Sequence, residues 1–177
     1  MCLSILNNEI SQFVYMSVEH VSKALYRMTS KNTELLFPVL TSSNKLLLHF
    51  RFIAHSFLTA LSSYIFDTAI GGNFDTLRAR LSHPQPDTEF SDVFAVTDAH
   101  SEVLDNILSA CLLRSGQKAV GDLLRGTLEI VLQLGVLAGE RQRGRLEEYQ
   151  AAPLLDDLYA NFRRKMSTLV TVSLLYA

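Results

Sequence analysis

Apolar residues recur along most of this chain at steps of three and four positions, which is the period of an amphipathic helix. The stretch from Phe90 to Arg114 is the most informative example, because it carries a histidine within a long apolar face. The positions on that face are Val93, Val96, His100, Val103, Ile107 and Cys111, widened by Leu104, Leu108 and Leu112. We therefore expect a buried packing helix, with His100 hydrogen-bonded at a helix interface rather than acting in catalysis.

Similar patterns predict helices before this stretch. A first amphipathic helix is expected over residues 10–28, and a second should start near Ser42, Ser43 and Asn44 and end at the pair Gly71 and Gly72. Asn73 can cap a short third helix over residues 74–81. The prolines of the segment 83–86 must end that helix, because proline has no amide hydrogen and restricts the residue before it.

Two further helices are predicted after a turn at Ser115 and Gly116. The first covers residues 120–136, and Pro153 suits the first turn of a last helix that reaches Val172. Glycine lowers helix propensity by about 1 kcal/mol relative to alanine in a helix interior. Close approach of another helix could explain the glycines in this region, and so could sequence drift. They are Gly121, Gly126, Gly135 and Gly139.

The sequence has no alternating segment of strand length, no internal repeat and no low-complexity tract. We therefore predict an all-α fold, an elongated bundle of five to six helices that forms a single domain over residues 1–177. The last helix ends in apolar residues without a glycine or a polar tail, so we expect a fragment or a shortened gene product.

Composition narrows the possible partners. With 48% hydrophobic and 19% charged residues, much of each helix should be covered by other helices or by a partner. Sixteen basic and eighteen acidic residues leave no basic excess for binding nucleic acid.

Two cysteines are too few for a disulfide framework and favour a reducing, intracellular compartment. The most apolar segment, Phe52 to Phe66, is shorter than the ~20 residues that a bilayer crossing needs, so membrane insertion is not expected.

The side chains that could take part in catalysis or metal binding do not form a catalytic, cofactor or metal site. His49 and His55 are six positions apart, whereas a metal-binding pair on a helix needs a spacing near four. His100 has Asp98, Ser101 and Glu102 beside it, but neighbours in one helix point in different directions and cannot converge as a triad. No glycine-rich loop follows a strand to hold phosphate. Basic clusters remain as candidate partner contacts, with solvated helix ends as the alternative. They are Arg141, Arg143 and Arg145, and also Arg163, Arg164 and Lys165.

Three segments carry a family likeness in their order and spacing. Phe57, Leu58, Leu61 and Tyr64 form the pattern "FL..L..Y", and Phe74, Leu77 and Leu81 form a short helix built around an aromatic residue. The pattern "D…AH..YL..I...CLL" is represented by Asp92, Ala99, His100, Leu104, Ile107, Cys111, Leu112 and Leu113. Together they resemble the C-terminal region of gamma-tubulin complex components. Val103 stands where the family usually has an aromatic residue and Phe74 where it often has tryptophan, so the chain resembles a divergent, accessory-type member.

The resemblance implies a non-enzymatic helical domain that binds gamma-tubulin beside other gamma-tubulin complex components. Its setting would be a microtubule-nucleating complex of the cytoplasm and cytoskeleton, at a microtubule-organising centre such as a spindle pole body or centrosome. The family-signature residues would be structural: Tyr64, Phe74, Asp92, His100, Leu104 and Cys111. One alternative is a helical scaffold or regulatory module that has lost gamma-tubulin binding. Another is a small helical enzyme using His100 or His55, which would require a polar pocket.

Overall fold

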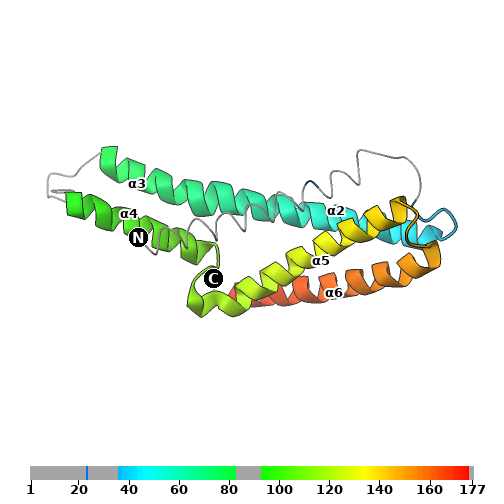
Figure 1. Ribbon diagram of the computed structural model, residues 1–177. Coiled ribbons are helices and arrows are strands. Elements are labelled where there is room, and N and C mark those ends of the chain that lie inside the picture. Colours follow the sequence, from blue (N-terminus) through cyan, green and yellow to red (C-terminus); the bar gives the residue numbers. More distant parts are fainter. Residues whose placement is uncertain (1–22, 24–35, 83–92, 176–177) are drawn as a thin grey trace. The chain divides into compact units, whose positions relative to one another are not determined.

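The computed structural model describes Lys23, residues 36–82 and residues 93–175, with the side chains of 173–175 excepted. Its elements after Lys23 are all helical (Figure 1): α2 (Thr41–Ser63), the π-helix η1 (Tyr64–Gly72), α3 (Asn73–Ser82), α4 (Val93–Ala110), the 3-10 turn η2 (Ser115–Gln117), α5 (Lys118–Gln142) and α6 (Glu148–Leu175). No strand occurs in these ranges, so the predicted all-α class is confirmed. The predicted helix over 10–28 lies outside them except for Lys23. The elongated shape and the count of five to six helices stay predictions.

The described chain groups into two compact units. Unit 1 contains the residues up to Leu58 and those from Asp122 onward, and unit 2 spans Thr59–Gly121. The boundaries fall within α2 and within α5. The expectation of a single domain over the whole chain stays a prediction.

In unit 1, α2, α5 and α6 enclose an aromatic and aliphatic core. The ring centroids of Phe50 on α2 and Phe162 on α6 are 5.0 Å apart, and Phe57 meets Phe162 edge-on at 6.2 Å. Burial of a side chain of this size contributes about 1.5–3 kcal/mol. The buried residues of each helix recur at steps of three and four: Leu47, Phe50, Ala54 and Leu58 on α2, Leu128, Val131, Leu134 and Ala138 on α5, and Ala151, Leu155 and Phe162 on α6. The apolar patterns of these three helices therefore mark the core of unit 1.

In unit 2, α3 packs on α4 through a small apolar cluster. The two helices lie side by side (Figure 1). Leu77 from α3 meets Ala99 and Val103 from α4, and Ile107 is packed against them. His100 is exposed, as are Val93 and Val96. The predicted burial of His100 is therefore wrong, because α4 turns the line through Ala99 and Val103 towards α3, and His100 lies one position away from it.

The chain continues as a helix through the glycine pair, where the sequence predicted a helix end. Residues 64–72 adopt the wider π-helical turn and lead directly into α3. A Cβ at Gly71 would lie 3.0 Å from the carbonyl oxygen of Phe66, so the glycine allows this close backbone approach. Asn73 has helical backbone angles, and its side chain donates to the carbonyl of Ala69 at 2.7 Å instead of capping a new helix. Burial of Ile65 and Ala69 within the π-helix supports the continuous path despite the propensity cost of glycine.

The last helix begins at Glu148, so the prediction that Pro153 stands in its first turn is wrong. Proline inside a helix removes one backbone hydrogen bond, which normally shifts the helix start towards it. Here Ala151, two positions earlier, is fully buried in the core, and the side chain of Glu148 is bound across unit 1. These tertiary contacts hold the turn before Pro153 in the helix.

Candidate partner-binding surfaces

A buried carboxylate joins the start of α2 to the start of α6. Glu148 is only 5% exposed. Its Oε1 accepts hydrogen bonds from the backbone amides of Val39 at 3.0 Å and Leu40 at 2.6 Å, immediately before α2 begins at Thr41. Amides at a helix start have no partner within the helix. Glu148 therefore caps α2 from a position more than 100 residues later in the chain, a role for which the sequence holds no local signal.

Asn44 secures the same end of α2 from within the helix. Its Oδ1 accepts from the backbone amide of Phe37 at 3.2 Å, and its Nδ2 donates to the carbonyl oxygen of Phe37. Both side chains are buried. The polar cluster predicted to start the helix therefore contributes through Asn44, while the helix itself begins at Thr41.

The predicted arginine cluster separates into one internal residue and two surface residues. Arg141 is 18% exposed in its side chain, donates to the carbonyl of Leu146 at 3.3 Å and lies 3.8 Å from the carboxylate of Glu148. Arg143 and Arg145 are exposed and share Oε1 of Glu140, at 2.8 and 3.5 Å. Exposed ion pairs of this kind contribute at most about 1 kcal/mol. Arg143 and Arg145 can thus turn to a partner, whereas Arg141 holds the connection between α5 and α6.

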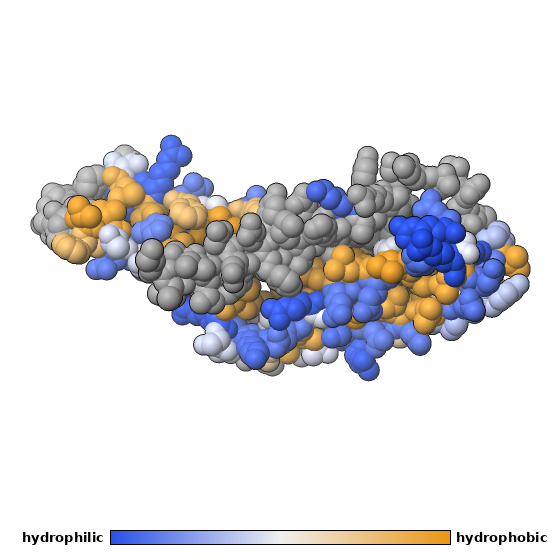
Figure 2. Space-filling view, in the orientation of Figure 1, coloured by the Kyte–Doolittle hydropathy of each residue, from blue (hydrophilic) through white to orange (hydrophobic). Residues whose placement is uncertain are grey.

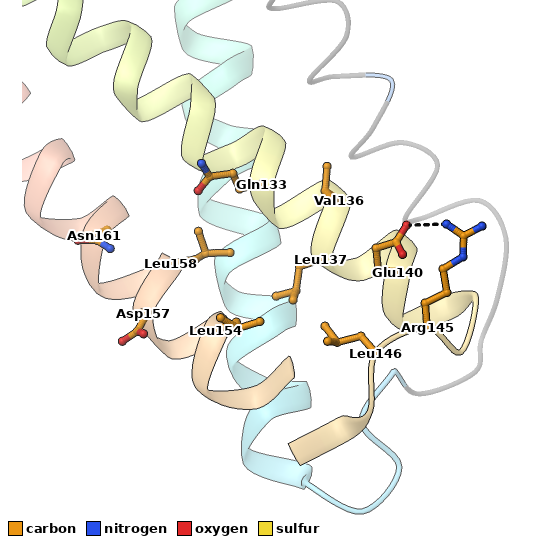
Figure 3. Close-up of a pocket in the computed structure, with 10 residues that line it drawn as sticks. All are labelled: Gln133, Val136, Leu137, Glu140, Arg145, Leu146, Leu154, Asp157, Leu158 and Asn161. Carbon is orange, nitrogen blue, oxygen red and sulfur yellow. Dashed lines mark ion pairs between the residues drawn. The ribbon is translucent and has the colours of Figure 1, made fainter. Parts of the chain in front are cut away.

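The outer side of the α5–α6 pair carries an apolar groove of about 480 Å³. Its walls are Val136, Leu137, Leu146, Leu154 and Leu158, and its polar members are Gln133, Glu140, Arg145, Asp157 and Asn161. Figure 3 shows Leu137, Leu154 and Leu158 directed towards one another, with the Glu140–Arg145 ion pair near the connector. On the face seen in Figure 2, apolar surface over these helices runs between hydrophilic patches. An apolar floor with a polar rim is the usual anatomy of a protein contact surface.

Two of the family-signature residues, Tyr64 and Cys111, lie near the end of α4. Tyr64 in η1 is 45% exposed, and its hydroxyl donates to the carbonyl of Ala110 at 3.1 Å. Cys111 follows directly and is half-buried, and this burial raises the pKa of its thiol. The thiol therefore stays protonated at neutral pH, which makes it a poor nucleophile. The segments of Tyr64 and Cys111 thus meet in the fold.

The other signature residues lie apart from this contact. Phe74 is exposed on α3, Leu104 is half-buried on α4, and Asp92 lies outside the described residues. Beside the exposed His100, the hydroxyl of Ser101 donates to the carbonyl of Thr97 at 2.9 Å. Glu102 pairs with Arg80 at 3.3 Å. These hydrogen bonds direct Ser101 and Glu102 away from a common point with the histidine.

The described ranges hold no group of three or more histidine, cysteine, aspartate or glutamate side chains placed to bind a metal ion. His49 instead contacts the hydroxyl of Tyr159, at 3.1 Å from its Nε2. Among the described helices, none combines the length and the apolar character needed to cross a membrane.

Comparison with known proteins identifies the family. The family model "Gamma tubulin complex component C-terminal" matches residues 12–175. A search of curated proteins and a search of solved structures each found no match. Because the family match covers most of the sequence, this chain belongs to the gamma-tubulin complex component family through its C-terminal region.

Proposed function

We propose that this chain is a non-catalytic component of a microtubule-nucleating complex and that it binds gamma-tubulin. The observation that carries the proposal is the family match over residues 12–175. Two of the signature segments support it, since Tyr64 and the end of α4 are joined by a hydrogen bond within one unit. Other gamma-tubulin complex components are the proposed neighbours, and a microtubule-organising centre, at a spindle pole body or a centrosome, is the proposed location.

The proposed mechanism is positioning. Long helices with a packed aromatic core hold contact side chains at fixed spacing, and Glu148 locks the start of two of these helices together. Fixed orientation of assembled partners removes much of the entropic cost of bringing them together. A row of such components would hold gamma-tubulin molecules in the arrangement from which a microtubule grows. The nucleotide chemistry would then belong to the tubulin partner.

Size-exclusion chromatography of the full chain with purified gamma-tubulin tests this proposal. We expect the two proteins to elute together at micromolar concentration. Elution of the unmodified chain should be compared with that of the surface variants Arg143→Glu and Arg145→Glu. Both side chains are exposed, so replacing them leaves the core intact. Separate elution of correctly folded chain and gamma-tubulin would support the alternative of a helical scaffold or regulatory module that has lost this contact.

A further inference from the structure

The groove between α5 and α6 has an apolar middle to which both helices contribute. On α5 it is lined by Val136, Leu137 and Glu140, and on α6 by Leu154, Asp157 and Leu158. Within each helix these positions are neighbours along the chain or lie three or four residues apart, so they share one face. Val136 is 63% exposed and Leu154 is 47% exposed. The helix pair therefore keeps an exposed apolar face on the side away from its core.

The two ends of this groove differ in charge. Figure 3 shows the Glu140–Arg145 ion pair at one end and Asp157 at the other, with Leu154 between them. At the first end the guanidinium groups of Arg143 and Arg145 share the single carboxylate of Glu140, which leaves an excess of positive charge. The side chain of Arg145 is 67% exposed, so it can also meet a carboxylate of a partner.

The negative end is the carboxylate of Asp157. This residue is exposed, and no hydrogen bond or ion pair involves its side chain in the part of the chain that the structure describes. Arg145 precedes α6, which begins at Glu148, whereas Asp157 lies about 14 Å into that helix at 1.5 Å per residue. Asp157 can therefore accept a cation from a partner without giving up an existing contact.

We propose that the groove between α5 and α6 is the interface of a symmetric dimer, in which a second copy of this chain occupies it. A two-fold axis through the apolar middle turns the copy end for end, so Arg145 of each copy would meet Asp157 of the other. Leu154 of each copy would enter the groove of the other. The helices α5 and α6 of both copies would then form a bundle around a shared apolar centre.

The mixed charge of the groove disfavours other occupants. A purely acidic helix would be repelled at Asp157, and a purely basic one at the arginine end. An anionic membrane surface is typically bound through clusters of about four to eight lysines and arginines, whereas the charged residues that line the groove are Glu140, Arg145 and Asp157. Glu147, the next carboxylate along the connector, is not among the lining residues. A second copy supplies both signs in the order that the groove requires.

Sedimentation velocity with the full chain tests the proposal. We expect the mass to rise from that of one chain to that of two as the concentration is raised through the micromolar range. Added salt should weaken the dimer, because screening reduces the attraction between exposed charges. The proposal goes beyond gamma-tubulin binding and does not depend on it.

Charge-reversal variants identify the contact between the copies. Arg145→Glu alone and Asp157→Arg alone should each raise the Kd of the dimer by about tenfold or more, since symmetry places the like-charge pair in the interface twice. An equimolar mixture of the two variants should recover the dimer, because each variant then meets the opposite charge at both contacts. This recovery distinguishes a charge pair across the interface from damage to the fold.

Matched leucine substitutions locate the apolar part of the interface. Leu154→Ala should raise the Kd by about five- to tenfold, as expected for an anchor residue. Leu48→Ala is the control, because Leu48 has a similar exposure of 53% but lies on α2 and does not line the groove. The control should dimerise like the unmodified chain, and circular dichroism should show equal helicity for all four variants.

Three results would overturn the proposal. The first is a chain that stays monomeric at every concentration, which would leave the groove to a different protein. The second is a dimer that Arg145→Glu and Leu154→Ala leave unchanged, which would assign the contact to another surface. The third is a mixture of Arg145→Glu and Asp157→Arg that remains monomeric. Because gamma-tubulin is absent from this assay, failure here leaves the co-elution test of the proposed function unaffected.

Discussion

The carbonyl oxygen of Leu112 lies against Gly121, so closely that a Cβ added to the glycine would be 2.9 Å from that oxygen. Leu112 has a φ of 60°, in the left-handed region that non-glycine residues rarely adopt. The amide of Leu113 donates to the carbonyl of Leu108 at 2.9 Å, and that of Leu112 donates to Ser109 at 3.1 Å. These are the two hydrogen bonds of a Schellman cap, which ends α4 and turns its last carbonyl towards the start of α5.

Gly121→Ala should therefore destabilise the chain. The atom in the way is a backbone carbonyl, which can move only with the whole cap, and overpacking of this kind costs about 1–3 kcal/mol. The higher helix propensity of alanine offsets about 1 kcal/mol of this destabilisation. Urea unfolding monitored by circular dichroism at 222 nm should show a lower midpoint for this variant.

Gly139→Ala is the control for that substitution. Gly139 stands in the same helix, α5, but an added Cβ there meets no atom within 4 Å. Without a clash, the propensity gain remains, and we expect a stabilisation of about 0.5–1 kcal/mol. Equal effects of the two substitutions would show that the approach of Leu112 to Gly121 does not constrain the fold.

The left-handed conformation of Leu112 predicts a ranking of two substitutions at that position. Leu112→Ala and Leu112→Gly both remove the half-buried side chain, so they share the loss of its contacts. Only glycine adopts a positive φ without a steric penalty, which amounts to about 1 kcal/mol for other residues. Differential scanning calorimetry should therefore show the glycine variant as the more stable of the two. A more stable alanine variant would contradict the Schellman cap at this position.

Helices could be predicted from the sequence because residues buried on one face of a helix recur along the chain at steps of three and four positions. Phe50, Ala54 and Leu58 recur at steps of four in the sequence, and all three are buried. The observed stripe of α4 is displaced by one position from the predicted one. Val103 belongs to both faces, but the line buried towards α3 runs through Ala99 and Val103, and His100 falls outside it.

The contacts that fix helix ends could not be predicted, because they depend on residues distant in sequence. Nothing near Glu148 indicates that its carboxylate binds the amides of Val39 and Leu40. The same holds for Arg141, whose neighbours Arg143 and Arg145 suggested one basic surface, while its own side chain reaches Leu146 and Glu148. The local propensity of the glycine pair at 71 and 72 predicts a helix end, because it carries no information on a π-helical turn supported by buried Ile65 and Ala69.

The burial of Cys111 predicts how its reactivity and its contribution to stability depend on pH. Desolvation disfavours the thiolate, so the pKa is raised in the folded chain. The folded state then holds the thiol proton more tightly than the unfolded state, and stability falls as pH rises above the ordinary thiol range. Alkylation by iodoacetamide, followed by peptide mass spectrometry at Cys111, should be slower in the folded chain than in denaturant at the same alkaline pH. Equal rates would show that the thiol is not desolvated.

Glu148→Ala should be among the most destabilising single substitutions in unit 1. It leaves the amides of Val39 and Leu40 without their carboxylate and removes the ion-pair partner of Arg141. A buried donor left without a partner costs about 1–3 kcal/mol, so thermal unfolding should begin well below that of the unmodified chain. Glu147→Ala, one position earlier and exposed, is the control, and exposed substitutions of this kind stay within about 0.5 kcal/mol. Arg141→Gln should fall between the two, because Glu148 retains both backbone hydrogen bonds in that variant. If Glu147→Ala and Glu148→Ala were equally stable, the link between the starts of α2 and α6 would not contribute to folding.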